Sequence, residues 1–262
     1  MRARIAIAFA LVLGISAVAF AADVPVTTLA RPSFPPPDHS VAATGATRLV
    51  VLFSDTRDPA TSPRIGIAAP WAPRSYAGFG LLRAFAQTGT VFLLYGADGS
   101  SARVLVAADA ATHQLRYAFD FARFTRPPLI KPGEAGFVTE QVMWAREAAG
   151  VLYVETAHST YAESSGGLNG YIAAISIRSG RILWRSPALV ANASTFVIAG
   201  NALVTGYGFT NEPDYLYLLD RKTGRVRDRL PLPSGPERIV RHGKRISVRT
   251  YDHVLGVELR LR

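Results

Sequence analysis

The stretch Gly170-Tyr-Ile-Ala-Ala-Ile-Ser-Ile-Arg-Ser-Gly-Arg-Ile-Leu-Trp-Arg185 decides how this chain is interpreted. Two runs of strand-like composition, residues 171–177 and 181–184, flank Arg178-Ser179-Gly180. Glycine takes a positive φ without steric cost, and a tight turn between antiparallel strands needs such a residue. The stretch is therefore predicted to be a β-hairpin.

The same pattern occurs twice more. Residues 216–226 carry it with Gly224 at the turn, and residues 105–117 carry it with His113 in the glycine position. Repetition of one β unit along a chain indicates an array of sheets rather than a single sheet.

Alignment of the three hairpins on Asp109, Ser176 and Asp220 gives spacings of 67 and 44 residues. A spacing near 44 matches one four-stranded propeller blade of about 40–45 residues, and the longer spacing fits a blade with an inserted loop. The side chain at the aligned position is expected to accept N–H groups of the turn, and the Thr or Ser before the glycine position adds a second local bond.

These units resemble the repeat of the pyrroloquinoline-quinone-type β-propellers, the quinoprotein alcohol dehydrogenase-like superfamily, whose pattern is L-x-A-L-D-x-x-T-G-x-x-x-W. Residues 170–185 match it best, and the resemblance covers roughly residues 90–260. It implies an all-β propeller. The chain length leaves room for about five four-stranded blades, including an incomplete or merged blade near the N-terminus.

The resemblance also implies a pyrroloquinoline quinone held by a vicinal disulfide, with Ca²⁺ beside a catalytic aspartate. This chain has no cysteine, and no position can be matched to the catalytic aspartate. The five histidines occur singly, without the spacing of a metal site. No cofactor and no metal are therefore expected, and no catalytic residue is assigned.

The N-terminal region divides into two segments. Residues 1–21 combine a basic start, an apolar run and Ala19-Phe20-Ala21, which is typical of a cleaved signal peptide. Residues 22–46 contain Pro35-Pro36-Pro37 and are expected to be an extended linker, followed by the propeller domain over residues 47–262. We expect a periplasmic or secreted protein without a membrane span after cleavage, and the lack of cysteine suits an oxidising compartment.

The formal net charge of +10 has two explanations. Arginines recur at alternating positions of strand-like segments, as in Arg225, Arg227 and Arg229, and this is typical of a solvated sheet face. No nucleic-acid motif accompanies them, so nucleic acid is not an expected partner. Electrostatic association with anionic surfaces of the envelope stays open.

Three polar-aromatic loops, residues 71–80, 158–171 and 206–215, are predicted to share one rim. Such loops suit recognition, because rings offer contact area and amides offer directional bonds. Packing between blades is the favoured explanation for Tyr171 and Tyr207. The candidate partner-binding residues are Trp71, Arg74, Tyr76, His158, Tyr161, Asn169, Tyr207, Asn211, Glu212 and Asp214.

The sequence thus favours an exported binding or scaffold module for a protein, peptide or envelope glycan. The alternative is an enzyme, either a quinone-dependent oxidoreductase or a hydrolase with its acids at the propeller mouth. Three serines, Ser159, Ser164 and Ser165, lie near His158 and Glu163 in the sequence and suggest nucleophilic catalysis, but the strand, G-x-S-x-G and helix context is absent. Among the expected strands are residues 136–142 and 150–155. The partner and the oligomeric state are not specified by the sequence.

Overall fold

The computed structural model describes residues 24–38, 40–41, 47–59 and 65–261, and the predicted signal peptide lies outside these ranges. Apart from one short 3-10 helix, the regular elements of the described chain are strands. No helix in this part of the chain is long and apolar enough to cross a membrane. The elements are β1 (Val26–Thr28), β2 (Thr47–Thr56), β3 (Ser75–Tyr76), β4 (Phe79–Gln87), β5 (Thr90–Gly96), β6 (Val104–Asp109), β7 (Leu115–Asp120), β8 (Gln141–Ala148), β9 (Val151–Ala157), η1 (Ala162–Ser165), β10 (Tyr171–Ser176), β11 (Ile182–Arg185), β12 (Val197–Ala199), β13 (Ala202–Tyr207), β14 (Tyr215–Asp220), β15 (Val226–Pro231), β16 (Pro236–His242), β17 (Arg245–Thr250) and β18 (His253–Leu261).

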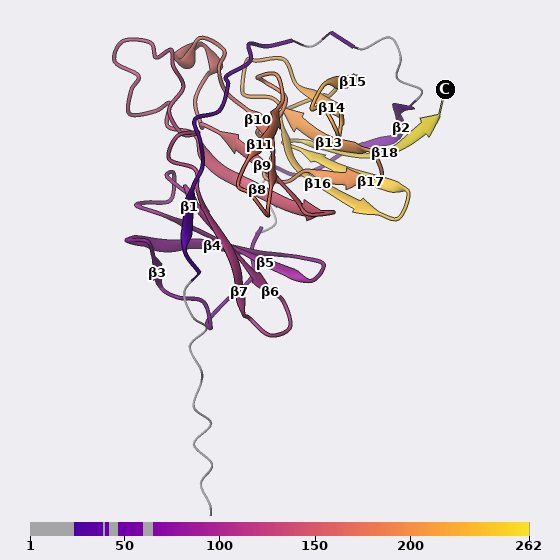
Figure 1. The fold of residues 1–262 in the computed structure, drawn as a ribbon. Coiled ribbons are helices and arrows are strands. Elements are labelled where there is room, and N and C mark those ends of the chain that lie inside the picture. Colours follow the sequence, from indigo (N-terminus) through magenta and orange to yellow (C-terminus); the bar gives the residue numbers. More distant parts are fainter. Residues whose placement is uncertain (1–23, 39, 42–46, 60–64, 262) are drawn as a thin grey trace, which may run out of the picture.

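These strands form four sheets in the described residues (Figure 1). The first sheet has the order β1-β7-β6-β5-β4-β3, and the second has the order β11-β10-β9-β8. The third sheet is β12-β13-β14-β15, and the fourth is β16-β17-β18-β2. The predicted all-β fold of four-stranded units is confirmed. The count of about five blades is not confirmed, because β1, β2 and β3 extend or complete other sheets instead of forming one of their own.

The three predicted hairpins are confirmed as β6–β7, β10–β11 and β14–β15. Gly180 and Gly224 have φ values of 65° and 71°, and His113 takes the same left-handed conformation at 61°. Each ladder has one register irregularity at the same position of the repeat. The glycine position of the repeat thus requires a left-handed backbone conformation, and His113 adopts that conformation as well.

Side chains cap these turns as expected. The Oδ1 atom of Asp109 accepts the N–H groups of Ala111 at 3.0 Å and Thr112 at 2.8 Å. The Oδ1 atom of Asp220 accepts two turn N–H groups in the same way. The bond from the Thr112 N–H holds the pKa of Asp109 below its ordinary value, because it favours the charged carboxylate.

The position four residues after each turn connects one sheet to the next. Tyr117 donates to Glu147 of β8 at 2.8 Å, and Trp184 donates to a carbonyl of the β14–β15 turn at 3.2 Å. The equivalent Asp228 accepts the N–H of Leu49 in β2 at 2.7 Å. One sequence position therefore joins the first sheet to the second, the second to the third, and the third to the fourth.

The N-terminal segment crosses the molecule. β1 pairs in parallel with β7 of the first sheet, and β2 pairs with β18 as the fourth strand of the last sheet. Figure 1 shows residues 29–38 rising from β1 to the top of the drawing. On its way Phe34 packs on Arg185 and Tyr171 of the second sheet. With the bond from Leu49 to Asp228 of the third sheet, this segment contacts all four sheets.

The core lies between the sheets. One cluster joins the first, second and third sheets, and another joins the third and fourth sheets. A third cluster lies on the other face of the first sheet, where Ala72 and Tyr76 pack against β5 and β6. Each sheet is thus apolar where it meets its neighbour.

The strand predicted over residues 136–142 is wrong in its bounds. β8 begins only at Gln141, and residues 121–140 form a long loop. Within that loop the N–H of Glu134 bonds to the carbonyl of Lys131, and the N–H of Phe137 bonds to that of Glu134. These local turns use backbone groups that a strand would direct to its neighbour.

Candidate protein-binding surface

The connections β7–β8, β9–β10 and β13–β14 lie at the same end of the sheets, because strand direction alternates within each sheet. We call this end the loop face and define it as residues 121–140, 158–170 and 208–214. Hydrogen bonds tie its loops together. The Lys131 N–H donates to the Ser164 carbonyl at 2.7 Å, and the Ala162 N–H donates to Glu212 Oε1 at 2.7 Å.

The β9–β10 loop is closed at its neck by Asn169. Its Oδ1 atom accepts the His158 N–H at 2.8 Å, and its amide donates to the His158 carbonyl at 3.3 Å. His158 Nε2 lies 2.7 Å from the Ser165 hydroxyl oxygen, and both side chains are buried. Burial lowers the pKa of His158 to about 4, so its ring is neutral at pH 7. The His158–Ser165 pair therefore supports the loop from inside and presents no exposed nucleophile.

Glu212 joins the second and third loops. Its Oε2 atom accepts a hydrogen bond from the hydroxyl of buried Tyr207. Its Oε1 atom accepts the N–H of Ala162, the first residue of the 3-10 helix η1. Burial, together with the bond to Glu212, raises the pKa of Tyr207. Above this network the ring of Tyr161 meets Phe209 edge-on, with centroids 5.2 Å apart. The two loops are thus fixed against each other, which favours a preformed surface.

Large apolar side chains are exposed on this face. Phe137 is 66% exposed, Leu129 59%, Ile130 44% and Tyr161 41%. Leu129 lies against the backbone of the η1 loop, since a Cβ on Gly166 would be 3.3 Å from its Cδ1. Exposed apolar side chains grouped on one face are typical of a surface that another molecule covers.

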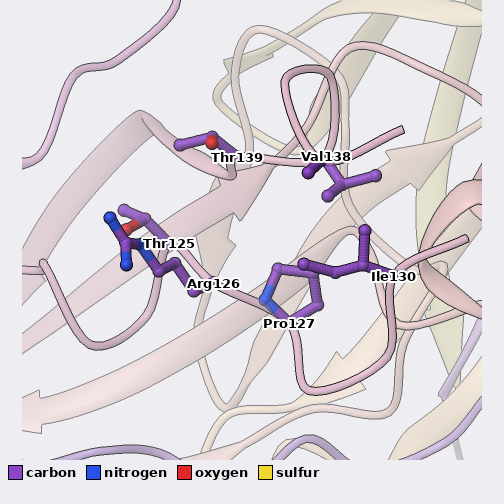
Figure 2. A pocket seen from close by; sticks show the side chains of 7 residues that line it. Thr125, Arg126, Pro127, Ile130, Val138 and Thr139 are labelled. Carbon is purple, nitrogen blue, oxygen red and sulfur yellow. The ribbon is translucent and has the colours of Figure 1, made fainter. Parts of the chain in front are cut away.

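A hollow of about 300 Å³ opens in the β7–β8 loop, and Ile130 is the one of these four side chains that lines it (Figure 2). Ile130, Val138 and Pro127 form its apolar part, while Thr125, Arg126 and Thr139 lie on the other side. Arg126 also lines an adjoining hollow of about 360 Å³, together with Arg31, Ala122 and Arg123. The loop face therefore combines an apolar centre with a basic margin.

The remaining predicted site residues have different surroundings. The ring of Trp71 stacks on His113 at the β6–β7 turn, with centroids 4.2 Å apart and planes 5° apart. Tyr76 is buried against the first sheet and donates to the Val24 carbonyl. Arg74 is exposed beside it. The structure thus brings the loops 158–171 and 206–215 together, while residues 71–76 pack over the first sheet.

Asn211 and Asp214 complete the predicted set. Asn211 is exposed on the loop face. Asp214 is half-buried, and its Oδ1 atom has no hydrogen-bond partner among the described residues. Burial, with Asp252 and Glu212 nearby, raises the pKa of Asp214.

Sequence reasoning missed Leu129, Ile130 and Phe137. Pro127 and Pro128 indicate only a break between strands, and the exposure of the apolar residues that follow depends on how the loop folds back. A run of apolar residues directly after two prolines, in a segment without strand pairing, is the one sequence signal for this surface.

Tyr171 belongs to a buried cluster around Arg185. The guanidinium donates to Glu140 at 2.8 Å, and neither side chain is exposed. It lies 3.8 Å from the ring centroid of Tyr171 and 4.3 Å from that of Phe34. Burial raises the pKa of Glu140 to about 7, although the charge of Arg185 opposes that rise. The cluster holds the N-terminal segment on the second sheet, so Tyr171 packs internally.

The residues do not fit a quinone with Ca²⁺. The chain has no cysteine for a vicinal disulfide. Within the described ranges, no group of three or more His, Asp or Glu side chains is placed to hold a metal ion.

The fold defines an all-β protein of three four-stranded sheets and one six-stranded sheet, of the propeller-like kind. No family model matches the chain, and no curated protein matches it. Solved structures that resemble it include the computationally designed Ika8 protein, with 10% identity over 68% of this chain and a TM-score of 0.44. BamB from Moraxella catarrhalis has 14% identity over 68% of this chain and a TM-score of 0.38. The quinohemoprotein alcohol dehydrogenase ADHIIG from Pseudomonas putida has 14% identity over 83% and a TM-score of 0.39. The chain spans 45%, 59% and 32% of those three proteins, and likeness at this level assigns no function.

Proposed function

We propose that this chain is an exported binding module whose loop face holds a protein or peptide partner of the cell envelope. The observation that carries the proposal is the group of exposed apolar side chains in the β7–β8 loop, namely Leu129, Ile130 and Phe137, of which Ile130 lines the 300 Å³ hollow. Water contact with Phe137, Leu129 and Ile130 is unfavourable by roughly 25 cal/mol per Å² of apolar surface, and a partner would remove it.

The basic margin limits the chemistry of that partner. Arg31, Arg123 and Arg126 form no ion pair with any described residue. A segment with apolar side chains flanked by acidic ones fits both parts of the surface. Because these arginines are solvent-accessible, added salt should slow association more than it weakens the apolar contact.

Site-specific photo-crosslinking in the producing cell tests the proposal. A photoreactive residue at Phe137 or Leu129 is expected to give one discrete protein adduct. The matched control is Leu183 of β11, which is apolar and 42% exposed but lies outside the loop face. It is expected to give no such adduct.

Introduction of negative charge at the exposed apolar positions supplies the second part of the test. Phe137→Asp combined with Leu129→Asp should abolish the adduct formed from Ile130 and leave the melting temperature unchanged, because both side chains are exposed. A polysaccharide adduct, an equal adduct from Leu183, or an adduct that persists in the double variant would each contradict a protein partner at this face.

A further inference from the structure

The tight turns of the sheets lie at the end opposite to the loop face, because strand direction alternates within each sheet. The β10–β11, β14–β15 and β16–β17 turns belong to the second, third and fourth sheets. We call this part of the molecule the turn end and define it as residues 177–181, 221–225 and 241–245.

Hydrogen bonds tie the three sheets together at the turn end. Trp184 Nε1 donates to the Arg221 carbonyl of the β14–β15 turn at 3.2 Å, and the Arg221 N–H donates to the Asn201 carbonyl of the β12–β13 turn at 2.9 Å. Arg241 of β16 donates to the Ile198 carbonyl of β12 at 3.0 Å. The three turns therefore belong to one continuous surface of the molecule.

Each of these three segments carries at least two exposed cations and no carboxylate. The carboxylate next to them, Asp220, is already engaged, because it caps its own turn and pairs with Arg227. The turn end therefore has a strong positive potential. Six of its cations are exposed and form no ion pair with a described residue, namely Arg178, Arg181, Lys222, Arg225, Lys244 and Arg245.

The loop face has a different balance of charge. Its segments contain the carboxylates of Glu134, Glu163 and Asp214 among their cations, and Lys131 pairs with Glu163 at 3.1 Å. Both signs of charge thus occur at the loop face, whereas the turn end has one sign. An asymmetric distribution of this kind orients a protein in the field of a charged surface, with the turn end toward an anionic one.

An exposed apolar side chain at the same end favours a bilayer over a polyanion such as nucleic acid. β18 is antiparallel to β17, so it runs toward the turn end, and it finishes there at Leu261, which is 80% exposed. The interface of a bilayer accepts cations at its headgroups and apolar side chains at the acyl boundary. The three segments of the turn end contain no aromatic residue on which a base could stack.

We propose that the turn end binds the surface of a bilayer that contains anionic lipids. The headgroup phosphates accept hydrogen bonds from the exposed arginines and lysines, and the loop face points away from the lipid. The inference does not depend on the partner of the loop face, because the two surfaces lie at opposite ends of the sheets.

Sedimentation with lipid vesicles tests the inference on the protein purified in the form that the producing cell accumulates. Vesicles of phosphatidylcholine with phosphatidylglycerol are the anionic probe, and vesicles of phosphatidylcholine alone are the neutral one. Binding to the anionic vesicles is expected to be at least tenfold tighter, and to be lost at about 0.5 M salt, where charges are screened within about 4 Å. Short duplex DNA at the same phosphate concentration should leave most of the protein on the vesicles.

Paired substitutions separate the turn end from the net charge of the protein. Lys222→Gln combined with Arg225→Gln should weaken binding to the anionic vesicles roughly 20-fold, because each cation at a bilayer surface contributes about fivefold. Lys244→Gln combined with Arg245→Gln should have the same effect from the next sheet. Melting temperatures should stay unchanged, because these side chains are exposed and form no ion pair with a described residue.

The matched control is Arg123→Gln combined with Arg126→Gln. It removes the same charge from two exposed arginines of the loop face and should change vesicle binding less than threefold. Equal affinity for the neutral vesicles, displacement of the protein by the DNA, or a loss in the control as large as that of the turn-end pairs would overturn the proposal.

Discussion

Replacement of Gly224 by alanine tests how the second and third sheets are joined. Gly224 has a φ of 71°, and an added Cβ would lie 2.5 Å from the Cε3 atom of Trp184. Gly200 offers a matched control, since its φ is 61° and a Cβ there would meet nothing within 4 Å. Both substitutions place alanine in the left-handed region, but only one of them drives a side chain into another sheet.

The expected magnitudes follow from these two conditions. Alanine in the left-handed region costs about 1–2 kcal/mol, which is the whole effect expected for Gly200→Ala. Overpacking against Trp184 adds about 1–3 kcal/mol, so Gly224→Ala should lose about 2–5 kcal/mol of unfolding free energy. For a domain of this size, each 1 kcal/mol lowers the melting temperature by about 2–4 °C.

Urea unfolding followed by circular dichroism measures both variants. A third chain that carries Gly224→Ala and Trp184→Ala should lose less than the sum of its single changes, because the smaller side chain removes the clash. If Gly224→Ala costs no more than Gly200→Ala, within about 0.5 kcal/mol, the contact does not join the sheets and the reasoning is refuted.

Two further predictions concern buried charge. Both carboxylate oxygens of Glu155 are buried without a hydrogen-bond partner in the described residues, and burial raises its pKa well above the ordinary value despite the opposing charge of Arg83. Because the folded pKa exceeds the unfolded one, the contribution of Glu155 to stability should be greatest below about pH 4.5 and decline as the pH rises above it. Glu155→Gln should flatten that decline in melting temperatures measured from pH 4 to 8, and an equal slope in both proteins would contradict it. Phe34→Ala removes a ring from Arg185 and should cost about 2 kcal/mol in urea unfolding, whereas the exposed Pro36→Ala should stay within about 0.5 kcal/mol. Equal losses in these two variants would show that the ring does not hold the segment.

Local signals in the sequence were enough for the hairpins. Asp109 and Asp220 cap their turns, and His113 adopts the glycine conformation, because these properties depend on a few neighbouring residues. The strand with which residues 47–56 pair could not be predicted in this way. Pairing of β2 with β18 depends on partners at the far end of the chain, and local pattern carries no information about them.

The candidate surfaces show a similar division. The loops that hold His158, Asn169 and Glu212 were predicted, and the structure joins them, but chiefly through buried bonds. The exposure of Phe137 is a result of loop packing and has no residue-type signal. Arg178, Lys222 and Lys244 resemble ordinary turn residues in sequence, and only the packing of the sheets brings their turns to one surface.

The pairing of β2 with β18 has a consequence for how the chain matures. The two strands lie roughly 200 residues apart in sequence, so β2 is synthesised well before the strand with which its backbone pairs. Until then Val50-Val51-Leu52-Phe53 is an unpaired apolar strand, the kind of segment that self-associates. A nascent or truncated chain without residues 253–261 would therefore be more prone to aggregation than the finished protein, in which this ladder secures both ends at once.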